Sequence, residues 1–499
     1  MGAPRMTAPA LEVVGVDKWF GANHANRAVS FAVAKGTIHG IVGENGAGKS
    51  TIMNIVYGTL TPDGGTVRLD GRDARVASPH DAIALGVGMV HQHFMLVEPF
   101  TALENVLLGF EGGATLAPGL RRARAGLERL AREYGLEVDL DRPVGELPVG
   151  AQQRVEILKA LHRGADLLIL DEPTGVLTPQ ETAHLFRILR ALKAQGKTVV
   201  IITHKLREIM ELTDAVTVMR RGQVVATLPT ADTDAAGLAE RMVGRPVLLR
   251  VDKSPATPGA PVLEVSGLRV GGAVKGIDLT VRAGEIVGIA GVSGNGQSEL
   301  LEALAGARAF DGTVRLHGRG LGHVPEDRQK VGLVTGLAAY ENAVLGHQSD
   351  AALNRHGLFD WAQARARCAR AMADYDIRPA DPELRTAGFS GGNQQKLVLA
   401  REIEGDPDLL LVGQPTRGVD IGAIEFIHRR LVALRDTGKA ILLVSAELDE
   451  IRALSDRILV MCAGRVVGEV PPDTDERTLG LMMAGVDPTG APHPSQRSA

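Results

Sequence analysis

"GIVGENGAGKST", residues 40–51, is the stretch of sequence that decides the expected fold. Apolar residues lead into a glycine-rich turn, and a helical pattern follows it. The spacing G-x-x-x-x-G-K-[ST] lets backbone N–H groups close around phosphates at a helix N-terminus. Lys49 can then reach the outer phosphates, and the Ser50 hydroxyl can take a Mg2+ position. The predicted nucleotide contacts in this loop are Gly43, Glu44, Asn45, Gly46, Ala47, Gly48, Lys49, Ser50 and Thr51.

The chain contains the same pattern twice. "LPVGAQQRVEILKAL" at 147 recurs as "FSGGNQQKLVLAREI" at 389, an offset of 242 residues that also relates Asp171 to Gly413. "GIVGENGAGKST" is answered by "GIAGVSGNGQSE" at an offset of 248. At 499 residues the chain exceeds the roughly 250 to 300 residues of a single core. The predicted parts are a first domain 1–251, a Pro-rich linker 252–261, a second domain 262–486 and a disordered tail 487–499.

Composition excludes several classes of protein. With 3% aromatic residues and a net charge of -4, the chain lacks the basic surface and stacking rings of a nucleic-acid binder. Its two cysteines support neither a disulfide framework nor a cysteine metal site. No apolar run approaches the roughly 18 to 20 residues of a membrane span. Short apolar runs that alternate with helical patterns predict a parallel β-sheet in each copy.

Polar residues follow three further apolar runs of the first copy. "LLIL" delivers Asp171 and Glu172 at a strand end, where parallel sheets bind ligands. Asp171 is predicted to hold Mg2+, and Glu172 to polarise the attacking water as a general base. His204 ends the run "TVVIIT" and could donate to the γ-phosphate, and the amide of Gln92 could reach both Mg2+ and water.

Aromatic and histidine residues near these motifs leave alternatives open. Phe20, or less favourably Trp19, could stack on an adenine ring, although an ordinary core aromatic is nearly as good an interpretation. His91 and His93 flank Gln92 and suggest a metal site, but no third ligand cluster accompanies them.

A phosphate loop, a Gln loop, an "LSGGQ"-like segment just before the acidic strand and a strand-end His, in this order, resemble the ATP-binding cassette of ABC transporters. The resemblance covers nearly the whole chain, twice. It implies an α/β fold with two tandem P-loop NTPase domains of the ABC type. Each would have a RecA-like parallel-sheet core, an antiparallel β portion and a helical signature subdomain. It also implies ATP hydrolysis, with ATP and Mg2+ as cofactors.

In that family two cassettes face each other head to tail, so each ATP lies between the phosphate loop of one and the "LSGGQ" segment of the other. By this resemblance one composite site is complete. The first copy supplies Lys49, Gln92, Asp171, Glu172 and His204, and the second supplies Ser390, Gly391 and Gly392 of "FSGGN" together with Asp420.

The other composite site is altered at almost every part. The second copy offers Gln297 in place of the phosphate-loop Lys, with Glu326, Gly413, Gln414 and Ala446. The first copy offers "LPVGA", in which Pro148 replaces the signature Ser, and Thr178 stands where the second copy has Asp420. The losses follow the composite sites and predict one hydrolytic site and one degenerate site.

Two fused cassettes with "GNGQSE" and "VPEDR" in the second copy resemble ATPase subunits of bacterial importers for simple sugars and nucleosides. "VHQHFMLVEPFTALENVLLG" and "GQPTRGVDIGAIEFIH" resemble the nucleoside branch more closely. The implied partners are two integral-membrane permease subunits and a solute-binding lipoprotein, with no nucleic acid. The implied location is peripheral, on the cytoplasmic face of the inner membrane, with membrane contact only through the permeases. "HFMLVEPF" is expected to line the groove that receives a permease helix.

Three alternatives follow from the same motifs. The first is the same role in a ribose- or galactose-type importer. The second is a soluble twin-cassette translation factor; such factors typically keep both sites intact and carry a long charged helical linker, which this chain lacks. A DNA-repair ATPase with zinc modules is excluded by the cysteine count.

Overall fold

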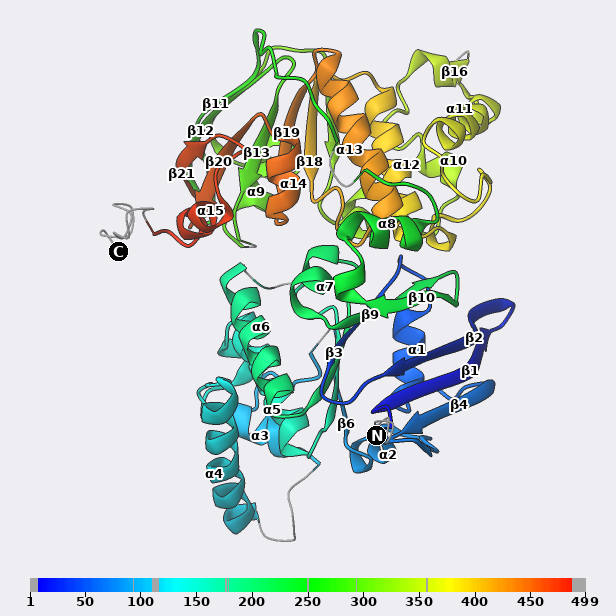
Figure 1. The fold of residues 1–499 in the computed structure, drawn as a ribbon. Helices are drawn as coiled ribbons and strands as arrows, with labels where there is room; N and C mark the ends of the chain where they lie inside the picture. Colours follow the sequence, from blue (N-terminus) through cyan, green and yellow to red (C-terminus); the bar gives the residue numbers. More distant parts are fainter. Residues whose placement is uncertain are drawn as a thin grey trace. The chain divides into compact units, whose positions relative to one another are not determined.

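The computed structural model describes residues 8–92, 94–109, 116–175, 177, 179–248, 251–292, 294–355 and 358–486 (Figure 1). The chain divides into two compact units, Met1–Val247 and Leu248–Ala499. Each unit has its own sheets and its own core, as the duplication predicts.

The first unit is built on a six-stranded sheet with strand order β10-β9-β3-β8-β7-β6. All pairings are parallel except that of β10 with β9. β3, β7 and β8 are buried along their whole length, because both faces of the sheet are covered. The strands are β3 (Ile38–Val42), β6 (Val87–Val90), β7 (Leu167–Asp171), β8 (Thr198–Ile202), β9 (Ala215–Arg220) and β10 (Gln223–Pro229).

Two further layers enclose this sheet. On one side an antiparallel sheet packs over α1, sharing a core with β3, β7 and β8. On the other side a mostly helical part packs through residues such as Leu127, Val155 and Leu189. The antiparallel strands are β1 (Leu11–Phe20), β2 (Asn23–Val33), β4 (Gly64–Leu69) and β5 (Arg72–Asp73). The helices are α1 (Lys49–Val56), α2 (Pro79–Ala84), α3 (Ala102–Leu107), α4 (Leu116–Tyr134), η1 (Val144–Glu146), α5 (Val149–His162), α6 (Pro179–Ala194), α7 (Leu206–Leu212), η2 (Thr230–Asp232) and α8 (Ala235–Val243).

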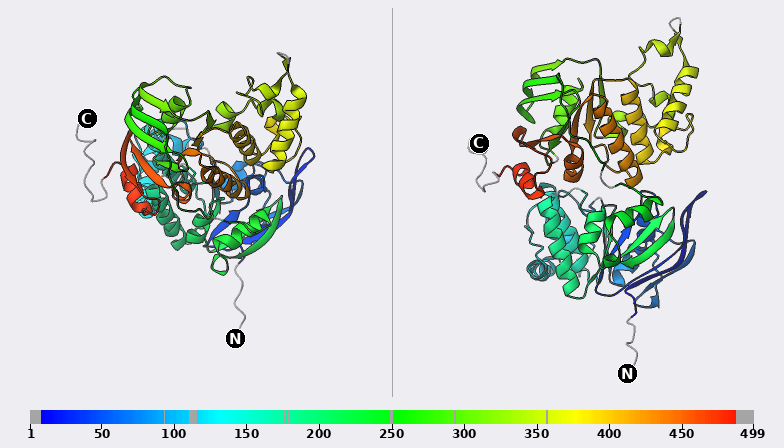
Figure 2. Two further views of the ribbon diagram at one scale, coloured as in Figure 1. Left: turned by 90° about the horizontal axis from the view of Figure 1, so that it is seen from above. Right: turned by 45° about the horizontal axis from the view of Figure 1, so that its top comes forward.

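The second unit repeats this plan with a central sheet ordered β15-β18-β19-β13-β20-β21 and an antiparallel sheet β12-β11-β14. Figure 2 shows this unit, coloured green to red, from two further directions. The central strands are β13 (Ile286–Ala290), β15 (Leu321–Val324), β18 (Leu409–Gly413), β19 (Ala440–Ser445), β20 (Arg457–Cys462) and β21 (Arg465–Val470). The others are β11 (Pro261–Val270), β12 (Val274–Arg282), β14 (Asp311–Leu316), and the hairpin β16 (Asn354–Arg355) and β17 (Leu358–Phe359). α9 packs between β11 and β18, as α1 does between the sheets of the first unit.

The helices of the second unit are α9 (Gln297–Leu304), η3 (Arg328–Gly332), α10 (Ala339–Asn342), η4 (Ala351–Leu353), α11 (Trp361–Asp374), η5 (Thr386–Gly388), α12 (Gly391–Glu404), α13 (Ile421–Asp436), α14 (Leu448–Leu454) and α15 (Glu476–Met483). η3 is a π-helical turn, and the described residues of the first unit contain no π-helical element. The fold class predicted from the sequence, two tandem α/β domains with parallel cores, is confirmed.

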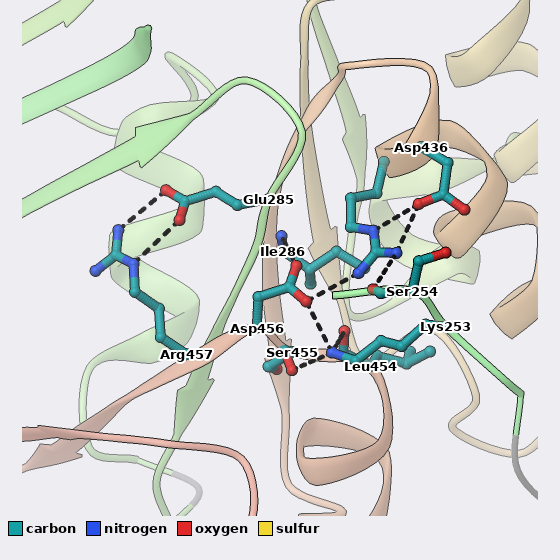
Figure 3. A network of polar contacts seen from close by, with 10 residues as sticks. Lys253, Ser254, Glu285, Ile286, Asp436, Leu454, Ser455, Asp456 and Arg457 are labelled. Carbon is teal, nitrogen blue, oxygen red and sulfur yellow. Dashed lines mark hydrogen bonds and ion pairs between the residues drawn. The ribbon is translucent and has the colours of Figure 1, made fainter. Parts of the chain in front are cut away.

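The predicted linker is attached to the second unit (Figure 3). Lys253 donates to the carbonyl of Leu454 and forms an ion pair with Asp456 at 2.9 Å. The carbonyl of Ser254 accepts from the fully buried Arg435 at 3.0 Å. Polar contacts therefore fix the beginning of a segment that its Pro-rich composition predicted only as a connection.

The predicted tail, 487–499, lies outside the described residues.

Candidate active site

The candidate site lies where four neighbouring parallel strands of the first unit end. β3 is followed by the glycine-rich loop, β8 by His204, and β6 by Gln92, while β7 ends in Asp171 and runs into Glu172. These strands are adjacent in the order β3-β8-β7-β6, so their carboxyl ends lie along one edge of the sheet. This edge is where open parallel sheets place ligands.

The glycine-rich loop has the geometry that its spacing predicts. Gly48 is the N-cap of α1 with φ of 94°, and a Cβ there would lie 2.5 Å from the carbonyl of Ala25. Lys49 opens the helix, is buried, and donates to the carbonyls of Gly43 at 2.8 Å and Glu44 at 3.0 Å. Burial lowers the pKa of the Lys49 amine, although Glu172 and Asp171 oppose the shift. The loop thus directs a buried cation toward the acidic strand end.

Ser50 and Asp171 form the part of the site suited to a cation. Asp171 is buried at the end of β7 and is hydrogen bonded to the Ser50 side chain. Burial raises the pKa of the Asp171 carboxyl, against the opposing effects of Ser50 and Lys49. A hydroxyl and a carboxylate are the oxygen donors that Mg2+ prefers beside phosphates. These two residues fit the predicted Mg2+ position.

Glu172 is held from two sides. Its Oε1 lies 2.9 Å from His204 Nδ1, and Gln92 Nε2 donates to its Oε2 at 3.2 Å. Its backbone has φ of 46°, an unusual conformation for a residue other than glycine, fixed by a hydrogen bond from its N–H to Ile202. Burial opposes ionisation, but His204 and Lys49 outweigh it, so the pKa of Glu172 lies below its ordinary value. An ionised, oriented carboxylate can accept a proton from water.

Sequence reasoning missed Glu208. This buried carboxylate on α7 accepts a hydrogen bond from Thr174, which follows the acid pair, and is hydrogen bonded to Thr203, which precedes His204. Burial raises the pKa of Glu208. It therefore ties the loop of Glu172 to the loop of His204. The repeat carried the signal, because Glu450 stands at the same 242-residue offset and pairs with His428 at 2.9 Å.

In the second unit the predicted residues of the signature segment, Ser390, Gly391 and Gly392, lie next to Asp420. Ser390 caps α12, and its Oγ accepts from the side chain of Asn393 at 2.9 Å. Asp420 caps α13 by accepting from the N–H of Ala423 at 2.8 Å. A Cβ on Gly392 would lie 2.9 Å from the Asp420 carboxylate, so the two segments are in contact. Each polar side chain has a local capping role besides the predicted role across the pair.

The second unit keeps the backbone of the candidate site but not its functional groups. Gln297 opens α9 after Gly296, as Lys49 opens α1, and Gln414 retains a positive φ of 47°. Ser298 donates to Glu326 at 2.6 Å. A Cβ on Gly413 would lie 2.6 Å from Cγ of Glu326. Glu326 therefore occupies the space in which an aspartate like Asp171 would have to fit.

The two aromatic residues predicted near the adenine ring lie at the surface. Phe20 and Trp19 are 47% and 48% exposed, which contradicts the core-aromatic interpretation. The Trp19 ring stacks on the His24 ring with centroids 3.7 Å apart, whereas the Lys18 amine lies over the Phe20 ring, 5.8 Å from its centroid. His93 and Thr178 lie outside the described residues. Within the described ranges no group of three metal-binding side chains occurs.

Comparison with known proteins places these features in a family. The model of the ABC transporter family matches residues 26–175 and 274–417. The chain is 45% identical to the nucleoside import ATP-binding protein NupA of Lactococcus lactis, covering 95% of this chain and 98% of that one. It is 45% identical to the guanosine import ATP-binding protein NupO of Bacillus subtilis, covering 95% and 97%. It is 44% identical to the glucose import ATP-binding protein TsgD13 of Haloferax volcanii, covering 96% of each.

None of the helices in the described part of the chain is both long and apolar enough to span a membrane.

Proposed function

Because the chain belongs to the ABC transporter family and is an ABC-type ATPase, we propose that it energises the import of nucleosides across the bacterial cytoplasmic membrane. The observation that carries the proposal is the Glu172 carboxylate, held between His204 and Gln92 at the same sheet edge as the phosphate loop. The nucleoside assignment is supported by two relatives, each 45% identical over 95% of this chain, that are named for nucleoside and guanosine import.

In this proposal the first unit binds ATP with Mg2+. The loop from Gly43 to Thr51 holds the phosphates through its N–H groups and Lys49. Ser50, Asp171 and Gln92 hold the metal ion, which neutralises charge on the phosphates when bound. Glu172 orients and deprotonates water, and His204 holds Glu172 and donates toward the γ-phosphate. Phe20 stacks on the adenine ring.

By the resemblance to paired cassettes, the hydrolytic site also needs the residues of an "LSGGQ"-like segment. Ser390 provides a hydroxyl, Gly391 and Gly392 provide backbone N–H groups, and Asp420 is the further residue of this set. The second phosphate loop does not hydrolyse ATP. Gln297 carries no charge. The amide oxygen of Gln414 accepts a hydrogen bond from the N–H of Ala446 at 3.2 Å and does not carry the charge of the Glu172 carboxylate.

The partners are two permease subunits and a solute-binding lipoprotein, and the chain lies on the cytoplasmic face of the membrane through the permeases. The surface that supports this is the apolar loop after Gln92. Met95, Val97 and Phe100 lie within one loop and are 65%, 37% and 39% exposed, and a group of exposed apolar side chains is typical of a surface that a partner covers.

A sugar importer is the second candidate. The relative named for glucose import is 44% identical over 96% of this chain, nearly as similar as the nucleoside importers. The solute is selected by other subunits, so the ATPase chain discriminates weakly between the two.

The test is to isolate the chain from its source cells with its membrane partners and to identify the solute-binding protein among them. That protein is then screened by thermal shift against nucleosides, ribose, galactose and glucose. A rise in melting temperature with nucleosides alone supports the proposal. A rise with a sugar alone overturns it in favour of the second candidate, and recovery of ribosomes in place of permeases overturns both.

A further inference from the structure

Arg328 joins three loops of the second unit that surround the predicted nucleotide contacts. It is the fourth residue after β15 and begins the π-helical turn η3. Its Nη1 donates to the carbonyl of Arg417 at 2.8 Å, in the loop that leads to Asp420. Its Nη2 lies against the signature segment, because a Cβ on Gly391 would be 2.5 Å from it.

The guanidinium of Arg328 is partly buried without all of its hydrogen bonds. Nε of Arg328 is buried and has no hydrogen-bond partner among the described residues. The charged groups that face it are Asp327 and Arg417, one of each sign, and burial lowers the pKa of Arg328. A buried N–H on a charged group that lacks a hydrogen-bond partner is unfavourable, because the group has lost its contact with water and gained nothing in exchange. Gln329 adds a second tie, since its side chain donates to Gln394 of α12 at 3.3 Å.

The two units differ at this position in step with their signature segments. The fourth residue after β15 is Arg328 where the signature reads Ser390-Gly391. The fourth residue after β6 is Phe94 where it reads Pro148-Val149. Glycine at 391 leaves the room that Nη2 occupies, and any larger side chain would collide with both Nη2 and the carbonyl of Gly418. An arginine at this position is therefore found in the unit that keeps the Ser-Gly of the signature segment, and not in the unit that has lost it.

We propose that Arg328 is a positioning residue for ATP hydrolysis. It holds Gly391 and the loop ending at Asp420 in one arrangement, so that both approach the nucleotide as a preformed unit. The proposal rests on the proposed function, in which these two segments complete the site of Glu172. Arg328 acts through them, since its contacts are with their backbone. Preorganisation of this kind matters because a displacement of about 1 Å at a distance from the reaction can cost about 100-fold in rate.

The test is single-turnover and steady-state ATP hydrolysis by the purified full chain. Arg328→Met removes the donors and keeps much of the side-chain volume. Lys330→Met is the matched control, because it removes the same charge two residues later from a side chain that is 84% exposed. We expect Arg328→Met to lower kcat about 10- to 100-fold with KM for ATP within about threefold of wild type. Lys330→Met should change neither.

A purely structural role would instead lower the melting temperature without this separation of kcat from KM. Arg328→Lys keeps the charge and one donor toward Arg417 and is expected to give an intermediate kcat with unchanged KM, which covers the case in which the Met variant does not fold. The inference is overturned if kcat of the Arg328 variants equals that of Lys330→Met, or if the loss lies in KM. Glu172→Gln is measured in parallel: if it retains full turnover, the site assignment itself has failed, independently of Arg328.

Discussion

Gly413 is the position at which the degenerate site can be tested most directly, because it stands where the first unit has Asp171. In Gly413→Asp the new Cβ would lie 2.6 Å from Cγ of Glu326 and 3.0 Å from both its backbone N and Cδ1 of Leu301. Overpacking of this kind costs about 1–3 kcal/mol. A buried carboxylate next to the half-buried Glu326 adds repulsion and desolvation. We expect the free energy of unfolding of the second unit to fall by about 3 kcal/mol.

The assay can report on one unit at a time, because the chain has only two tryptophans, Trp19 and Trp361. In a Trp19→Phe background, the fluorescence of Trp361 follows the second unit of the full chain. Trp361 packs edge-on against Tyr340 and Phe359, with ring centroids 5.9 and 4.7 Å away, so unfolding changes its surroundings. A urea titration then gives the midpoint and the slope from which the loss of stability is calculated.

Two variants control the interpretation. Gly272→Asp places the same side chain at an exposed position with no atom within 4 Å and should leave the midpoint unchanged. Removing the opposing side chain in Glu326→Ala should make Gly413→Asp less damaging, with a coupling of about 1–2 kcal/mol between the two changes. Equal midpoints for Gly413→Asp and Gly272→Asp, or a strictly additive double variant, would refute the reasoning.

Three further predictions concern the chemistry and pH dependence of the chain. Glu172→Gln should lower kcat about 100- to 10,000-fold while ATP binding, measured by equilibrium titration, persists, because the phosphate loop is untouched; full turnover would remove Glu172 from its role. Gln414→Ala should change kcat far less than Glu172→Gln, and equal losses would contradict the model of two unequal sites. His39 is buried with Nε2 2.8 Å from Thr217, and burial lowers its pKa to about 4. Above its ordinary value near 6.5 it is neutral in both states, and below that value the unfolded chain binds the proton more readily. The free energy of unfolding of the first unit should therefore fall by up to about 3 kcal/mol between pH 6.5 and 4, as followed by Trp19 fluorescence in a Trp361→Phe background. His39→Gln should flatten this decline, and an unchanged slope would show that other groups cause it.

Local motifs carried most of the predictable content. The glycine loop before Lys49 and the acid pair after "LLIL" each depend on the conformation of about a dozen consecutive residues. Their placement at strand ends could therefore be predicted from the local sequence. The repeat then made the second unit predictable from the first. The family and the fold class are confirmed by the comparisons, whereas the roles of the individual site residues remain predictions.

Long-range packing carried the rest. Glu208 contacts Thr174, 34 positions earlier, and Arg328 contacts Arg417, 89 positions later, so neither contact is marked by any local spacing. The exposure of Phe20 and the ion pair of Lys253 with Asp456 also depend on how distant segments pack against each other. The Pro-rich composition around Lys253 predicts only that the segment is neither helix nor strand.

Sequence alone determined that the chain is two ATP-binding cassettes with unequal functional groups, because the second copy has Gln297, Gly413 and Gln414 where the first has Lys49, Asp171 and Glu172. Only the tertiary structure decided what became of the altered site. A missing side chain leaves a volume, and close packing requires that a neighbour fill it. Glu326, 87 residues before Gly413 in the chain, fills that volume and takes the hydroxyl of Ser298.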